Sequence, residues 1–206
     1  MRGFREFGDS GKLAESETIG QSSIIKTAEQ QFRESSHEHS YHIHFREARD
    51  LVRGVQDRAK LPYDPAHPGG RRYPFAHELH AKVAEGLELS NEELQKGCLK
   101  LFTAVGSVLD KMHGVDGFLE YRLESGKVVF VYFDITANPL KTSAKSSEIA
   151  LIEVPINGFD FDDQDDQQLF SEIVSTSAEE ICLRFNRLLQ SGDRGRTRTY
   201  RRQAHV

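Results

Sequence analysis

Five polar side chains in the middle of the chain have the types and spacing that phosphodiester chemistry requires. Asp116 falls in one predicted strand, and Asp134 and Thr136 fall two residues apart in the next strand. Lys141 and Lys145 follow about one helical turn apart. Two carboxylates offer hard oxygen ligands to Mg²⁺, which keeps several waters for phosphate oxygens and a nucleophile. A lysine beside them stabilises the negative charge that develops on phosphate.

Whether the two carboxylates meet depends on the register of the hairpin that carries them. Residues 115–123 alternate in polarity, and residues 127–135 are β-branched and aromatic, which predicts two strands. A three-residue loop over 124–126, with glycine in the left-handed position, places Asp116 directly opposite Asp134. Like charges in such a pair, with Cβ atoms about 5 Å apart, need a cation, a raised pKa or a basic neighbour. A two-residue loop would put the aspartates on opposite faces.

The same residues also have structural roles open to them. Asp116 could cap the turn that precedes its strand, and Asp134 could accept a hydrogen bond from the turn at Asn138. Lys141 and Lys145 could belong to an ordinary solvated helix face. Both interpretations stay open at the level of the sequence.

Apolar residues at helical spacing predict helices over 37–60, 74–86 and 178–189. The longest such pattern starts at the capping-box sequence of Ser90 and predicts one helix that ends near His113, before a glycine suited to the left-handed C-terminal position. A short helix is expected from Pro139, because proline suits the first turn. The sequence EIALIEV, residues 148–154, predicts a further strand.

These elements predict an α/β fold, with α+β as the alternative. We expect a mixed sheet of three or four strands with a central preceding helix and flanking helices. The expected organisation has four parts: a disordered N-terminal segment at 1–36, a helical subdomain at 37–89, a nuclease-like α/β core with a C-terminal helix at 90–190, and a basic disordered tail at 191–206.

The order of helix, Gly-Val-Asp116, hairpin, Phe-Asp134-Ile-Thr136, lysine-bearing segment and strand resembles the core of the PD-(D/E)xK restriction-endonuclease-like superfamily. The resemblance covers roughly residues 90–155. It implies that Asp116 and Asp134 hold catalytic Mg²⁺, or Mn²⁺ in its place. Thr136 stands where that superfamily usually has its lysine.

The resemblance further implies that Lys141 or Lys145 supplies the missing ammonium group, and that Glu93 or Glu120 adds a ligand. The activity it implies is magnesium-dependent hydrolysis of DNA phosphodiester bonds. Residues 192–200, GDRGRTRTY, resemble the translated end of a tRNA gene, which suggests a nuclease carried by a mobile element.

Composition limits the alternatives. The net charge of −5 argues against a general polyanion binder, and no apolar run reaches the roughly 18 residues of a membrane helix. The N-terminus lacks the apolar region of a secretory signal, and two cysteines suit a reducing compartment, so we expect a cytoplasmic protein. The expected partner is DNA, with a homodimer or a protein partner also open. The alternative functions are a non-catalytic interaction scaffold and a metal-binding protein that uses His37, His39, His42 and His44.

Overall fold

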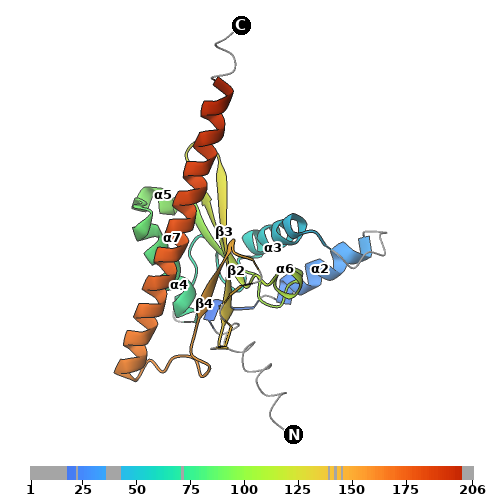
Figure 1. The fold of residues 1–206 in the computed structure, drawn as a ribbon. Helices are drawn as coiled ribbons and strands as arrows, with labels where there is room; N and C mark the ends of the chain where they lie inside the picture. The colour runs from blue at the N-terminus through green and yellow to red at the C-terminus, as the bar shows by residue number, and fades with distance from the viewer. Residues whose placement is uncertain are drawn as a thin grey trace.

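A computed structural model describes residues 18–21, 23–35, 43–70, 72–138, 140–141, 143–144 and 146–200, with the backbone alone at 32–35 and 192–200. Figure 1 shows its elements in chain order. These are α2 (Ser23–Ser35), α3 (Phe45–Ala59), α4 (Pro74–Gly86), α5 (Asn91–Gln95), β1 (Leu99–Thr103), α6 (Val108–His113), β2 (Gly117–Arg122), β3 (Val128–Thr136), β4 (Ile149–Glu153) and α7 (Gln164–Tyr200). None of these helices combines the length and the apolar character needed to cross a bilayer.

The four strands form one mixed sheet in the order β1-β2-β3-β4. The pairs β1–β2 and β2–β3 are antiparallel, whereas β3 and β4 are parallel. The α/β fold with a four-stranded mixed sheet and flanking helices is therefore confirmed.

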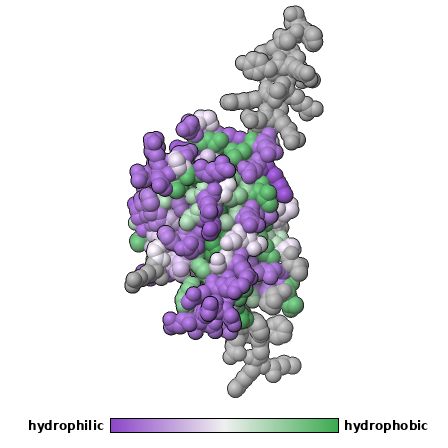
Figure 2. Space-filling view, turned by 90° about the vertical axis from the view of Figure 1, so that its left-hand side faces the viewer, coloured by the Kyte–Doolittle hydropathy of each residue, from purple (hydrophilic) through white to green (hydrophobic). Residues whose placement is uncertain are grey.

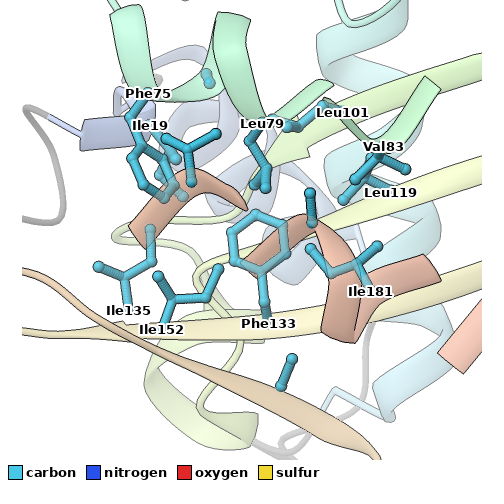
Figure 3. Packing of buried hydrophobic residues seen from close by; sticks show 14 of the residues in the cluster. Ile19, Phe75, Leu79, Val83, Leu101, Leu119, Phe133, Ile135, Ile152 and Ile181 are labelled. Carbon is cyan, nitrogen blue, oxygen red and sulfur yellow. The ribbon is translucent and has the colours of Figure 1, made fainter. Parts of the chain in front are cut away.

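Two groups of helices cover opposite faces of the sheet. On one face, α4 and α7 pack onto the odd-numbered residues of β1, β2 and β3 and onto Ala150 and Ile152 of β4. Figure 3 shows Leu79 and Ile181 meeting Phe133 there. On the other face, α2, α3 and α6 contribute Ile25, Val52 and Leu109 to a second apolar cluster, with even-numbered residues of β1, β2 and β3 and with Ile149 of β4. The segment 37–89, expected as a helical subdomain, thus supplies one helix to each face of the sheet.

The predicted single helix from Ser90 to His113 is wrong. The capping box at Ser90 forms as expected, but α5 ends at Gln95 and β1 follows it. The apolar residues of β1 fit a helical period as well as a strand, because this strand is buried on both faces. Gly97 and Gly106 take positive φ angles of 67° and 79° on either side of β1 and interrupt helical geometry there.

The structure differs from the sequence-based predictions in three other segments. Residues 23–35, expected to be disordered, form α2 and bury Ile25. The predicted C-terminal helix is part of a 37-residue α7 that continues into the expected basic tail as far as Tyr200. The described residues between β3 and β4 form turns rather than the expected short helix, and its first residue, Pro139, lies outside the described residues.

A buried histidine links α4 to the first strand. The ring of His80 is 8% exposed, and its Nε2 lies 3.2 Å from the carbonyl oxygen of Leu99. Burial lowers the pKa of His80 below 6.5, with nearby His67 and His77 acting in the same direction. The folded protein therefore resists protonation of this ring.

We expect this histidine to make folding stability depend on pH. As the pH falls below 6.5, the unfolded chain binds a proton at His80 that the folded chain does not, so stability is lost. His80→Gln keeps an N–H donor for Leu99 but does not titrate. Urea unfolding between pH 7.5 and 5 should show a smaller loss for the variant, the difference not exceeding about 1.4 kcal/mol per pH unit. Equal losses in both proteins would contradict this account.

Candidate active site

The hairpin that carries the two aspartates has the predicted register. Leu123 N donates to Lys127 O across a three-residue loop, and Gly126 in that loop has a φ of 79°. The ladder pairs Arg122 with Val128 at one end and Gly117 with Phe133 at the other. Asp116 precedes the last of these pairs, and Asp134 follows it.

Asp116 completes the end of this ladder with its side chain. Strand β2 begins at Gly117, so the Ile135 N–H lies beyond the last backbone pair. The Asp116 carboxylate fills that position, since its Oδ2 accepts from Ile135 N at 2.7 Å. The backbone N of Asp116 donates to Phe133 O at 3.0 Å, and the residue is 3% exposed. The carboxylate is therefore bonded directly to the residue next to Asp134.

Gly117 allows this close approach. A Cβ atom on Gly117 would lie 2.3 Å from Cζ of Phe133, so the phenyl ring occupies the space of the missing side chain. Any larger residue would push the two strands apart where they carry Asp116 and Asp134.

Asp134 is paired with one of the two predicted lysines. Its Oδ2 lies 2.6 Å from Nζ of Lys141, and the side chains are 6% and 34% exposed respectively. The turn after β3 directs Lys141 back toward the strand, because Lys141 N donates to Asn138 O. Lys145 lies outside the described residues, so its predicted role is not tested.

Thr136 belongs to the same turn. Its Oγ1 accepts from Asn138 N at 3.1 Å, and the residue is buried. Thr136 and Asp134 are alternate residues of β3 and therefore share a face. The structure thus brings Asp134, Thr136 and Lys141 together around one turn, beside Asp116.

The carboxylate oxygens of Asp116 and Asp134 suit a magnesium ion that takes only some of its ligands from the protein. Among the described residues, no group of three or more His, Cys, Asp or Glu side chains is placed to hold a metal. Two carboxylates on neighbouring strands, with water and phosphate oxygens as the other ligands, match the usual way in which proteins bind Mg²⁺.

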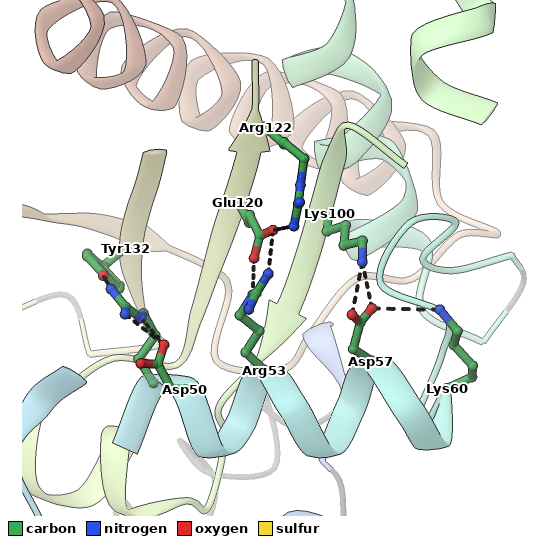
Figure 4. A network of polar contacts seen from close by, with 9 residues as sticks. Asp50, Arg53, Asp57, Lys60, Lys100, Glu120, Arg122 and Tyr132 are labelled. Carbon is green, nitrogen blue, oxygen red and sulfur yellow. Dashed lines mark hydrogen bonds and ion pairs between the residues drawn. The ribbon is translucent and has the colours of Figure 1, made fainter. Parts of the chain in front are cut away.

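The two glutamates expected as further ligands are engaged elsewhere. Glu93 closes the capping box of α5. Glu120, 1% exposed, is bound by Arg53 through two hydrogen bonds and lies 3.4 Å from Arg122 (Figure 4). Its negative charge is therefore balanced by α3 and by its own strand.

Three polar contacts join helix α3 to the strands on this side of the sheet. Arg49 donates to the Tyr132 hydroxyl at 3.3 Å, and Figure 4 shows Arg53 on Glu120 and Asp57 on Lys100. Sequence reasoning missed these contacts. A signal was present, since residues 49, 53 and 57 recur every four positions and would share one face of a helix.

The histidine tract is only partly within the described residues. His44 is the N-cap residue of α3, and its backbone N donates to Glu47. His37, His39 and His42 lie outside the described residues.

Removing Arg53 should strongly destabilise the protein. Arg53→Ala would leave the buried Glu120 with only the 3.4 Å contact to Arg122. Breaking a buried pair completely costs about 3–5 kcal/mol, so we expect a loss of up to that size. Denaturant unfolding measures this loss. Arg58→Ala, at an exposed site on the same helix, is the matched control and should change stability by no more than about 0.5 kcal/mol.

Replacing both partners separates charge burial from packing. We expect the double variant Arg53→Leu/Glu120→Leu to recover most of the lost stability, because no unpaired charge remains in the core. A double variant as unstable as Arg53→Ala alone would refute the electrostatic explanation.

Comparison of the chain with known protein families, with curated proteins and with solved structures gives no match. The resemblance to the PD-(D/E)xK superfamily therefore stays a prediction, and the function is argued from the geometry of the site.

Proposed function

We propose that this protein is a metal-dependent nuclease that hydrolyses DNA phosphodiester bonds. The observation that carries the proposal is the 2.6 Å contact between Lys141 Nζ and Asp134 Oδ2, beside a second buried carboxylate. That second carboxylate, Asp116, is bonded to the backbone of the residue next to Asp134. Two acids and an ammonium group at the end of neighbouring strands are the groups that hydrolysis assisted by a divalent ion requires.

Each residue of the site has its own role in the proposed hydrolysis. Asp116 and Asp134 would hold Mg²⁺ or Mn²⁺ through their oxygens. When bound, the ion supplies an activated water and a positive charge at the phosphate. Lys141, the more exposed partner, donates to the phosphate oxygens as their negative charge grows. Thr136 fixes the Asn138 turn, and this turn holds Lys141 in place.

A second candidate function follows from the same contacts. Ile135 N–H satisfies Asp116, and Lys141 neutralises Asp134, so the sheet end is stable without any ion. A protein that used these contacts only for stability would be a non-catalytic interaction scaffold on the same fold.

DNA cleavage by isosteric variants distinguishes the two functions. Asp134→Asn and Asp116→Asn remove a charge but keep an oxygen that accepts hydrogen bonds, so the Ile135 contact survives. We expect the wild-type protein to cut plasmid or single-stranded DNA with Mg²⁺ or Mn²⁺, and each variant to lose at least about a hundredfold in rate. Asp163→Asn is the matched control and should cut normally, because Asp163 is exposed in the aspartate-rich segment 160–163 that precedes α7.

Metal binding provides an independent readout. Mn²⁺ should raise the melting temperature of the wild-type protein but not that of Asp134→Asn, because binding to the folded state alone stabilises it. Absence of cleavage on both forms of DNA, together with a melting temperature unmoved by Mn²⁺, would reject the nuclease and favour the scaffold.

A further inference from the structure

The turn after β3 carries the most exposed large apolar side chain in the described part of the chain. Leu140 is 86% exposed, whereas the next in order, Leu183, is 51% exposed. Partly exposed apolar residues are ordinary, and Figure 2, which views the molecule from the left-hand side of Figure 1, shows them scattered among hydrophilic ones. Leu140 differs in degree and in position, because the next residue, Lys141, contacts Asp134.

This turn reverses the usual distribution of apolar and charged side chains. Burial of a leucine stabilises a fold, and a lysine normally stays in water. Here the Lys141 side chain reaches the sheet and is 34% exposed, while Leu140 remains in solvent. Local rules of this kind are broken chiefly at functional sites, where the lost stability is offset elsewhere in the fold.

Hydrogen bonds hold the turn in this conformation. Asn138 Oδ1 accepts from Leu140 N at 3.0 Å, and Asn138 O accepts from Lys141 N at 3.0 Å. Asn138 N in turn donates to Thr136 Oγ1 at 3.1 Å. Leu140 is therefore presented to solvent by a backbone that is already fixed, so little ordering is needed when it meets a ligand.

We propose that Leu140 is an apolar wedge that inserts between neighbouring bases of duplex DNA, beside the phosphate that Lys141 contacts. The inference rests on the proposed function, because it takes DNA as the substrate. Consecutive Cα atoms are about 3.8 Å apart, so a strand whose phosphate meets Lys141 passes Leu140 within one residue. Leucine is one of the side chains that insert between base steps in protein–DNA complexes and partly unstack the duplex there.

Insertion also explains how a phosphate reaches the two acids. Asp116 and Asp134 are 3% and 4% exposed, so both carboxylates lie below the surface. An undistorted duplex is stiff over the length of a binding site. A wedge that opens one base step kinks the duplex, and the kink lets more of the DNA backbone follow the protein surface toward the sheet end. Leu140 is thus a positioning residue for the phosphate.

The surroundings of Leu140 in the chain favour DNA over a protein partner. Stable protein interfaces bury about 800 Å² on each side, with an apolar centre made of several residues. In the described part of this turn, the Leu140–Lys141 pair is flanked by Asn138 and Ser143, which are polar and exposed. A single apolar side chain between polar groups suits the gap between two bases.

Fluorescence of a DNA duplex that contains 2-aminopurine tests the insertion. This base is brighter when it is unstacked, and Ca²⁺ replaces Mg²⁺ so that binding is measured apart from cleavage. We expect the wild-type protein to bind the duplex and to raise its fluorescence, and Leu140→Ala to lose the rise. Leu140→Met keeps a large apolar side chain and should retain it. The melting temperature should not change in either variant, because Leu140 is exposed.

Leu188→Ala is the matched control for the fluorescence experiment. It makes the same change at a site on α7 that is 43% exposed, and it should leave the rise intact. A duplex bound without a rise, a rise that survives in Leu140→Ala, or no binding to duplex DNA would each overturn the wedge. Loss of the rise in Leu188→Ala as well would point to general apolar contact and would also overturn it.

The positions of the cuts separate failure of the wedge from failure of the proposed function. Pyrimidine–purine steps unstack easily, whereas A-tracts are stiff, so wild-type cuts along a long duplex should fall at TA and CA steps at least about tenfold more often than within A-tracts. Leu140→Ala should lose this preference, and Leu140→Met should keep it. Cleavage without a step preference, or of single-stranded DNA alone, would overturn the wedge and leave the nuclease. A fluorescence rise without cleavage in any metal would reject the nuclease and leave the wedge.

Discussion

Two buried carboxylates at the end of the β2–β3 ladder must each be compensated, because a charge left unpaired in the interior costs several kcal/mol. Asp116 is compensated by a backbone N–H that the short β2 strand leaves beyond its last pair. Asp134 is compensated by Lys141, which the turn at Asn138 brings back to the sheet. The arrangement of this end of the sheet follows from these two requirements. Under the proposed function, a divalent ion takes the place of the Lys141 ammonium group and balances the negative charge of Asp134 instead.

The two faces of the sheet are stabilised in different ways. Between the sheet and the helices α4 and α7, the contacts are almost wholly apolar. On the other face, α3 combines an apolar core with a row of charged contacts that reaches the buried Glu120. Arg49 adds to this row by lying 4.2 Å from the centre of the Phe130 ring, a cation–π contact. The polar face therefore fixes the position of α3 over the strands that carry the acids.

The parts of the fold that could be predicted from sequence are those set by local rules. Gly126, expected in the left-handed position of a three-residue loop, predicted the hairpin register. Proline at the first position of α4 indicated where that helix starts. The prediction of one helix from Ser90 to His113 was wrong because β1 is apolar on both faces. Its sequence therefore lacks the alternation of polar and apolar residues that indicates a strand. Helix α2 was missed because only a few apolar residues, such as Ile25, anchor it. For the site, the sequence offered Lys141 and Lys145 as alternatives on an expected helix, whereas a turn at Asn138 brings Lys141 to Asp134. The bond from Ile135 to Asp116 depends on where β2 begins.

The most direct measurement is anomalous scattering from a crystal of the wild-type protein soaked in Mn²⁺. The account predicts one strong peak in contact with carboxylate oxygens of both Asp116 and Asp134, with the Lys141 ammonium displaced from its present partner. A map without a peak there, in which Asp134 keeps its lysine, would contradict it and leave the acids as structural groups.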